Sequence, residues 1–160
     1  MKALIVIDMQ DEYVGKDRNQ KRFPYDSERL IKNINMRIDE YERNRDLVMY
    51  VKNKRKTDRA SDLVDGLRLA SELVFEKDRA SCFSNSSLLA YLTDKEVREI
   101  ELAGVDGNSC VGISALDGIR YGFTICLSLP CIGIANEERF NLTREKLLEA
   151  KIILNGKIGD

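Results

Sequence analysis

The chain has 160 residues, of which 43% are hydrophobic and 33% charged, and its formal net charge is −1. This length and composition predict one globular domain spanning residues 1–160, and the near-zero charge excludes a general attraction to nucleic acid or to an anionic membrane. No apolar run approaches the roughly 20 residues of a transmembrane helix, and the N-terminal run is too short for a signal peptide. We therefore expect a cytoplasmic protein without a nucleic-acid or membrane partner.

Two features of the composition restrict the chemistry. The four cysteines form no C-x-x-C pair, and without a secretory context they are expected to be reduced. Histidine is absent, which excludes Ser-His-Asp and Cys-His catalysis and histidine-ligated zinc. Any catalysis must then depend on carboxylates, lysines or thiols, and we expect neither a metal nor another cofactor.

The first third of the chain predicts a strand, a helix and a second strand. The apolar run from Lys2 to Ile7 is typical of a strand buried on both faces of a parallel sheet, and it ends at Asp8. Residues 9–24 are polar and predict a long loop, after which Asp26 can cap a helix. The apolar face of that helix comprises Leu30, Ile31, Ile34, Ile38 and Tyr41. Residues 46–52 form the second strand, and such a unit makes a right-handed parallel crossover.

The middle of the chain predicts a loop, a short strand and a short helix. Residues 53–65 are charged and contain no repeat, so we interpret them as a short loop. Residues 73–76, L-V-F-E, predict a third strand that is followed directly by Lys77. The leucines within residues 88–92 then fit one face of a brief helix.

A fourth strand, a tight turn and a helix follow. Residues 97–103 predict the strand, residues 104–109 the turn, and Cys110 begins the helix, preceded by the capping-type residues Asn108 and Ser109. On the first turn of a helix, free N–H groups and the helix dipole favour an anion, which predicts thiolate character for Cys110. The alternative is a small buried residue that helps the helix pack on the sheet.

The remaining residues complete an α/β pattern. A fifth strand is predicted at 123–129 and should stop at Pro130, a helix from Thr143 to Glu149 should follow, and residues 152–154 form a last strand. This alternation predicts a three-layer αβα sandwich around a single, mostly parallel sheet.

Three chemically useful side chains are expected at one edge of that sheet. Asp8, Lys77 and Cys110 each follow a strand, and ligands of open α/β sheets bind beyond the carboxyl ends of the strands. A lysine can stabilise a thiolate, a carboxylate can move the thiol proton, and the turn before a helix offers N–H donors to an oxyanion. Each residue alone could instead be structural: Asp8 a loop cap, Lys77 part of a solvated turn, and Cys110 a core residue.

Three segments carry a resemblance to a known family. The segments A-L-I-V-I-D-M-Q with Asp8, V-F-E-K-D-R-A-S-C-F-S-N-S-S-L with Lys77, and A-G-V-D-G-N-S-C-V with Cys110 resemble the isochorismatase-like cysteine hydrolases, which include nicotinamidases and carbamoyl-amide hydrolases. The resemblance implies a Rossmann-like six-stranded sheet of order 3-2-1-4-5-6 and an Asp8–Lys77–Cys110 triad. The implied activity is metal-independent hydrolysis of a small amide or ester through a thioester on Cys110.

The resemblance also implies details of the site and of the assembly. It implies a cis peptide between Val105 and Asp106, an oxyanion hole formed by the N–H groups of Asp106 and Cys110, and a substrate pocket lined by Tyr13 and Phe83. Related proteins are often dimers or tetramers in which a neighbouring subunit closes the pocket, so we expect a homo-oligomer.

Departures from the family pattern leave alternatives open. Nicotinamidases of the family share a metal site of one aspartate and two histidines, which a chain without histidine cannot form, so nicotinamide is not the expected substrate. If the substrate were a vinyl ether, Asp8 would matter more than Cys110. A second alternative is a catalytically silent binding or assembly module, which the short loop at 53–65 would favour. A flavodoxin-type nucleotide-binding domain is disfavoured because M-Q-D-E-Y after the first strand lacks glycine.

Overall fold

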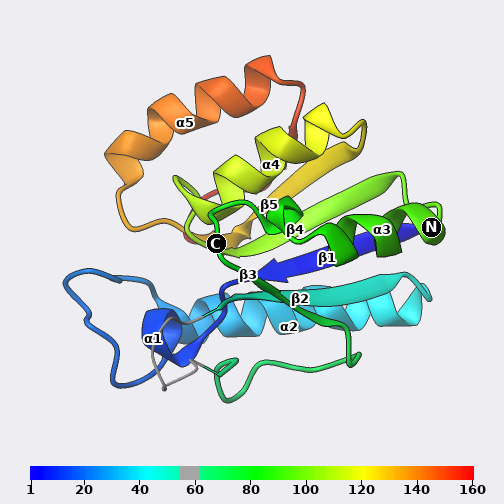
Figure 1. Ribbon diagram of the computed structural model, residues 1–160. Helices are drawn as coiled ribbons and strands as arrows, with labels where there is room; N and C mark the ends of the chain where they lie inside the picture. The colour runs from blue at the N-terminus through cyan, green and yellow to red at the C-terminus, as the bar shows by residue number, and fades with distance from the viewer. Residues whose placement is uncertain (55–61) are drawn as a thin grey trace.

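The computed structural model describes residues 1–54 and 62–160 and forms one α/β sandwich (Figure 1). A six-stranded sheet of order β3-β2-β1-β4-β5-β6 lies in the middle, and every neighbouring pair of strands is parallel. The strands are β1 (Lys2–Ile7), β2 (Leu47–Asn53), β3 (Val74–Lys77), β4 (Glu99–Val105), β5 (Thr124–Gly133) and β6 (Ile153–Asn155). The predicted fold class and strand order are confirmed.

Helices cover both faces of the sheet, which makes three layers (Figure 1). They are α1 (Asp11–Val14), α2 (Ser27–Arg43), α3 (Ser86–Asp94), α4 (Cys110–Arg120) and α5 (Glu137–Glu149), with a 3-10 turn η1 (Cys82–Ser84) before α3. On β1, Leu4 and Val6 pack in the core under α2, whereas Ala3, Ile5 and Ile7 pack in the core under α3, α4 and α5. Alternate side chains of β1 therefore enter two different cores, as predicted for a strand buried on both faces.

Helix α2 forms where the sequence predicts it because its cap and its apolar face agree. The Asp26 side chain accepts a hydrogen bond from the N–H of Arg29. The buried face of α2 comprises Leu30, Ile34, Ile38 and Tyr41. Beside this face, Arg37 donates to both carboxylate oxygens of Glu101 on β4, which is 1% exposed and also accepts from the Tyr41 hydroxyl at 2.9 Å. A buried carboxylate needs such partners, so this network fixes α2 over β4.

Two predicted boundaries around irregular backbone are wrong. Strand β5 does not stop at Pro130 but continues to Gly133. The pairing of β4 with β5 shifts register between Leu102 and Gly104, and such an irregularity accommodates a residue that has no N–H to donate. The predicted loop at residues 9–24 also contains the single helical turn α1.

Helix α5 begins earlier than predicted. Asn136 caps it by accepting a hydrogen bond from the N–H of Arg139 at 2.8 Å, whereas Thr143 lies inside the helix. The Thr143 hydroxyl donates instead to the side-chain oxygen of Asn108, in the turn before α4, at 2.8 Å. Asparagine and threonine are both capping types, so local sequence does not decide between them. The predicted loop at 53–65 lies partly outside the described residues.

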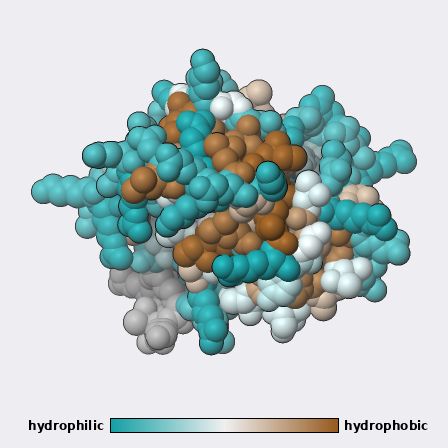
Figure 2. All heavy atoms as spheres, turned by 90° about the horizontal axis from the view of Figure 1, so that it is seen from above, coloured by the Kyte–Doolittle hydropathy of each residue, from teal (hydrophilic) through white to brown (hydrophobic). Residues whose placement is uncertain are grey.

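The outer face of α4 and α5 carries exposed hydrophobic side chains (Figure 2). The large hydrophobic residues exposed on these helices and in the turn after α4 are Ile113, Tyr121, Leu142 and Leu148. None of the helices in the described part of the chain combines the length and apolar character that crossing a membrane requires.

Gly104 allows β1 and β4 to approach each other closely at their carboxyl ends. Its φ is +115°, and a Cβ at this position would lie 2.0 Å from the carbonyl oxygen of Ile7. Ile7 directly precedes Asp8, and Gly104 is the second-last residue of β4, which leads through a turn to Cys110. A side chain at position 104 would therefore separate the two strand ends that carry two of the candidate residues.

We expect Gly104→Ala to destabilise the protein more than Gly122→Ala. Gly122 also has a positive φ, +89°, but apart from its two chain neighbours no described residue has an atom within 4 Å of where its Cβ would be. Gly122→Ala should therefore cost only backbone strain, about 1–2 kcal/mol. Gly104→Ala adds a clash with main chain and should cost more than about 4 kcal/mol. Urea unfolding of both variants measures the difference, and equal losses of stability would show that the contact with Ile7 is relieved by a small shift.

Candidate active site

Asp8 is the residue at which β1 ends. Its N–H donates to the carbonyl oxygen of Val51 at 2.9 Å, and its φ of 55° then turns the chain out of the strand. Aspartate tolerates this left-handed conformation better than most residues. Its side chain is only 3% exposed, so a buried carboxylate lies at the edge where the carboxyl ends of the strands meet.

The buried ammonium group of Lys77 connects the predicted residues. Lys77 is the last residue of β3, and its side chain has no exposed area. Its Nζ lies 3.2 Å from Oδ2 of Asp8 and 3.4 Å from Sγ of Cys110. It also donates to the side-chain oxygen of Asn53 at 2.7 Å and to the main-chain oxygen of Arg79 at 3.2 Å. The structure thus brings Asp8, Lys77 and Cys110 together from three separate parts of the chain.

The turn before α4 is held by the side chain of Asp106. One carboxylate oxygen accepts from the N–H of Asn108 at 2.7 Å. The other accepts from the Tyr25 hydroxyl at 2.9 Å and from the N–H of Ala135 at 2.7 Å. These bonds fix the backbone just ahead of Cys110, which is half-buried as the first residue of α4.

Two N–H groups at this turn are available to a ligand. The Val105–Asp106 peptide bond is cis, as the resemblance implies. Within the described ranges 1–54 and 62–160, neither the N–H of Asp106 nor that of Cys110 donates to a main-chain oxygen. Ser109 stands at the N-cap position, but its side chain makes no capping hydrogen bond, contrary to the role predicted for it. Unpaired N–H groups at the start of a helix can stabilise an oxyanion.

The predicted thiolate character of Cys110 is not found in the resting site. Burial and the neighbouring Asp8 carboxylate raise the pKa of the Cys110 thiol to about 11, and the ammonium of Lys77 opposes them only in part. Burial also raises the pKa of Asp8, against the effect of Lys77. The Oδ1 atom of Asp8 is buried and has no hydrogen-bond partner among the described residues. Burial and the charge of Asp8 therefore favour a neutral thiol, and the Asp8 side chain next to it can accept the thiol proton.

Asn53, which the sequence analysis did not single out, belongs to the same cluster. It is the last residue of β2, and its side-chain NH₂ donates to the Tyr13 hydroxyl at 2.9 Å while its oxygen accepts from Lys77. Tyr13 lies on α1, with its ring packed edge-on against Phe23 at 5.1 Å between centroids. The available signal for Asn53 was its position, because Asp8 and Lys77 end strands at the same edge.

Phe83 lies in the hydrophobic core instead of beside the other predicted residues. It is 4% exposed, and its ring stacks on Phe123 with the centroids 5.8 Å apart and packs against Tyr121 at 5.7 Å. These partners follow the last residue of α4, whereas Cys110 is its first residue. This placement gives Phe83 a packing role, and the pocket role implied by the resemblance stays a prediction.

The residues present do not fit the metal site that the resemblance implies for nicotinamidases. The chain contains no histidine, and in the part that the structure describes no three cysteine, aspartate or glutamate side chains gather closely enough to hold a metal ion. The cluster around Lys77 also contains a buried cation already, which would repel a metal ion.

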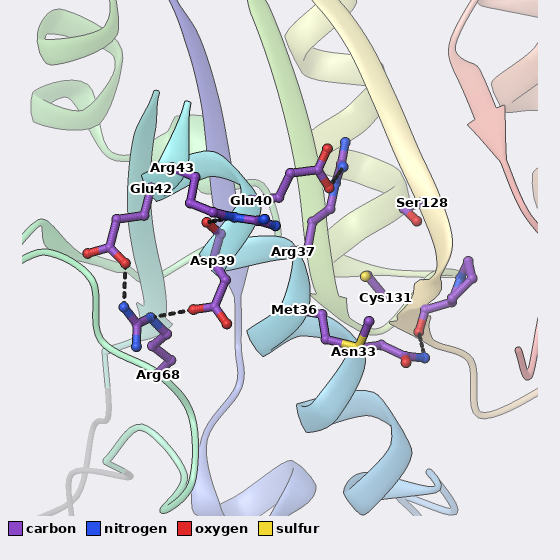
Figure 3. Close-up of a pocket in the computed structure, with 11 residues that line it drawn as sticks. Asn33, Met36, Arg37, Asp39, Glu40, Glu42, Arg43, Arg68, Ser128 and Cys131 are labelled. Atoms are coloured by element: carbon purple, nitrogen blue, oxygen red, sulfur yellow. Dashed lines mark hydrogen bonds and ion pairs between the residues drawn. The ribbon is translucent and has the colours of Figure 1, made fainter. Parts of the chain in front are cut away.

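A groove of about 670 Å³ lies away from this cluster, along α2 (Figure 3). Arg68 lies beside it and forms ion pairs with Asp39, at 2.7 Å, and with Glu42. Farther along the groove, the side chain of Asn33 donates to the carbonyl oxygen of Pro130 at 2.9 Å. None of the three predicted catalytic residues lines this groove, so it is separate from the candidate active site.

Known proteins are similar to this chain in sequence and in structure. The isochorismatase domain family matches residues 2–144. Maleamate amidohydrolase from Pseudomonas putida is 32% identical over an alignment of 89 residues that covers 49% of this chain and 42% of that protein. The matched stretch thus spans less than half of that relative.

Solved structures share the whole fold. N-carbamoylsarcosine amidase from Thermoplasma acidophilum has a TM-score of 0.80 at 18% identity, covering 99% of each chain. Nicotinamidase from Bacillus subtilis has a TM-score of 0.79 at 19% identity, covering 97% of this chain and 99% of that one. An isochorismatase-like hydrolase from Alkaliphilus metalliredigens has a TM-score of 0.79 at 24% identity, covering 96% of this chain and 92% of that one. The structural similarity shows the fold, and the match over residues 2–144 shows the family: the chain belongs to the isochorismatase domain family.

Proposed function

We propose that the chain is a metal-independent cysteine hydrolase that cleaves a small amide or ester through a thioester on Cys110. The observation that supports this most is the buried ammonium of Lys77, which contacts both the carboxylate of Asp8 and the sulfur of Cys110. One cluster then contains a nucleophile, a proton acceptor and a fixed positive charge.

In the first half-reaction, Asp8 takes the thiol proton as Sγ of Cys110 attacks the carbonyl carbon of the substrate. The negative charge moves from the carboxylate to the reacting atoms and stays close to Lys77. The carbonyl oxygen becomes an oxyanion that accepts hydrogen bonds from the N–H groups of Asp106 and Cys110. When the tetrahedral intermediate collapses, the bond to the leaving group breaks, and Asp8 returns its proton to the leaving amine or alcohol.

In the second half-reaction, water hydrolyses the thioester. Asp8 removes a proton from the water as its oxygen attacks the thioester carbon, and the same two N–H groups stabilise the second oxyanion. The C–S bond then breaks, the carboxylic acid leaves, and the sulfur of Cys110 regains a proton from Asp8. The raised pKa of Asp8 suits a group that must accept and release a proton in each half-reaction.

The names of the relatives indicate the substrates to test first. Maleamate, N-carbamoylsarcosine and nicotinamide are all small amides, although the missing metal site argues against nicotinamide. We propose that the ring of Tyr13 lines the pocket that receives the acyl group. A cytoplasmic location and a dimer or tetramer whose neighbouring subunit closes the pocket stay predictions from the sequence.

We expect Cys110→Ala to abolish hydrolysis by the purified protein. Loss of a covalent nucleophile lowers kcat by more than about 1,000-fold. The measurement is product release from a panel of small amides and esters, together with the intact mass of the wild-type protein after acid quenching, which should show an acyl adduct. Circular dichroism of Cys110→Ala should match that of the wild type.

Two other outcomes would contradict this mechanism and favour an alternative. Hydrolysis that survives in Cys110→Ala but not in Asp8→Asn would contradict the thioester route. Cleavage of a vinyl ether with the same dependence on Asp8 alone would favour that alternative. If the wild type hydrolyses no member of the panel and Cys110 resists alkylation at every pH, a silent binding module would be favoured.

We expect Asp8→Asn to have opposite effects on turnover and on thiol reactivity. The negative charge of Asp8 raises the pKa of Cys110, so its removal lowers that pKa and increases the thiolate fraction at any pH below it. Labelling of Cys110 by iodoacetamide at pH 8 should therefore become roughly tenfold faster for each pKa unit lost. Hydrolysis should nevertheless disappear, because an asparagine at position 8 cannot accept the thiol proton and pass it to the leaving group.

Cys126 serves as an internal reference in the labelling experiment. Burial and Glu101 raise its pKa to about 11, and Asp8 is not among the groups that shift it. Peptide mapping by mass spectrometry should show an unchanged rate at Cys126 when Asp8 is replaced. Slower labelling of Cys110 in Asp8→Asn would show that Asp8 does not oppose ionisation of the thiol.

A further inference from the structure

The ammonium of Lys77 has more hydrogen-bond acceptors around it than N–H groups to donate. An ammonium has three N–H groups, whereas four acceptors lie within hydrogen-bonding distance of Nζ. The shortest contact, 2.7 Å, is with the neutral side-chain oxygen of Asn53, and a second neutral oxygen, that of Arg79, lies at 3.2 Å. The third N–H group is then shared by Asp8 and Cys110, the two groups that change charge during the proposed reaction.

The orientation of the Asn53 amide is set by its other contact. Its NH₂ group donates to the hydroxyl of Tyr13 at 2.9 Å. An amide presents a donor on one side and an acceptor on the other, so the bond to Tyr13 directs the oxygen toward Lys77. The N–H of Asn53 in turn donates to the side-chain oxygen of Gln10 at 2.9 Å, which fixes the backbone at the end of β2.

We propose that Asn53, oriented by the hydroxyl of Tyr13, is a positioning residue that holds the Lys77 ammonium between Asp8 and Cys110. This inference rests on the proposed hydrolase function. The two neutral oxygens occupy two N–H groups throughout the reaction. The third N–H can then follow the negative charge from the carboxylate to the sulfur as the thiol proton moves, without movement of the lysine side chain. The ring of Tyr13 lines the pocket, while its hydroxyl acts through Asn53.

Removing the amide should displace the ammonium toward Asp8. In Asn53→Leu the strongest acceptor that remains is the charged carboxylate, because hydrogen bonds between ions are stronger than those to neutral groups. The contact of Lys77 with Sγ then lengthens, and the thiol loses the cation that lowers its pKa. We expect labelling of Cys110 by iodoacetamide at pH 9 to become roughly five- to tenfold slower, which corresponds to somewhat less than one pKa unit.

The labelling profile depends on every titratable group that faces Cys110. Among residues 1–54 and 62–160 these groups are Asp8 at the end of β1, Lys77 on β3, Tyr13 on α1, and Tyr25 ahead of α2, whose pKa is raised by burial and by Asp106. Both tyrosines have raised pKa values and stay neutral at pH 9, so the change in labelling reports on Asp8, Lys77 and Cys110 alone.

Asn33→Leu is the matched control. Asn33 also donates from its side chain to an oxygen of another element, the carbonyl of Pro130 at 2.9 Å, but it lies on α2 away from the candidate site. The same substitution there should leave the labelling profile of Cys110 unchanged. Tyr13→Phe is the second variant, because it removes a single oxygen atom; it should slow labelling in the same direction as Asn53→Leu but by less.

A double-mutant cycle measures whether Tyr13 acts through Asn53. With an amide that the wild type hydrolyses, Asn53→Leu and Tyr13→Phe should each lower kcat with little change in KM. Combining them should lower kcat no further than Asn53→Leu alone. If the losses of kcat in the two single variants add up in the double variant, Tyr13 does not act through Asn53.

The failure of this inference can be told apart from the failure of the proposed function. If labelling of Cys110 in Asn53→Leu is as fast as in the wild type, while Asp8→Asn changes it, the positioning role is wrong and the triad stands. If Cys110→Ala retains hydrolysis, the hydrolase mechanism is wrong whatever Asn53 does.

Discussion

The structure depends on the burial of one lysine ammonium. Removing a charged group from water costs several kcal/mol unless polar partners surround it. The partners of Lys77 come from the ends of β1 and β2, from the residues after β3, and from the first turn of α4. These four parts of the chain can meet only if the parallel strands keep their register and end at a common edge. The requirement for a compensated charge and the architecture of the sheet therefore support each other.

The same burial determines the resting chemistry of the site. Low exposure raises the pKa values of both Asp8 and Cys110, and a single cation is shared between them. A preformed thiolate beside a carboxylate would place two negative charges next to one positive charge in a poorly solvated site. A neutral thiol beside a carboxylate has the lower energy, so in the proposed mechanism the thiolate forms by proton transfer inside the cluster. Because Lys77 lies between Asp8 and Cys110, this proton transfer costs little free energy.

The helices on the two faces of the sheet have different roles. On one face, α2 is attached through the buried pair of Arg37 and Glu101 and borders a groove in which Arg68 is paired with Asp39 (Figure 3). On the other, α4 and α5 pack over the sheet, and α4 begins at Cys110. At the carboxyl edge, Gly104 lets β1 and β4 approach closely, and the Asp106 carboxylate ties the turn to Tyr25 and Ala135. The layers thus position the short turn that leads to Cys110.

By itself, the sequence determined the order of strands and helices, because uninterrupted apolar runs and capped amphipathic segments are local signals, and the family motifs located Asp8, Lys77 and Cys110. It misplaced the end of β5 and the start of α5, because a bulge around Pro130 and the choice between Asn136 and Thr143 depend on neighbouring elements. Only the tertiary structure decided that Phe83 belongs to the core, that Asn53 lies in the cluster around Lys77, and that burial and Asp8 raise the pKa of the Cys110 thiol. Each of these depends on burial and on charges from distant parts of the chain, and pKa values and contacts of this kind are properties of the assembled fold.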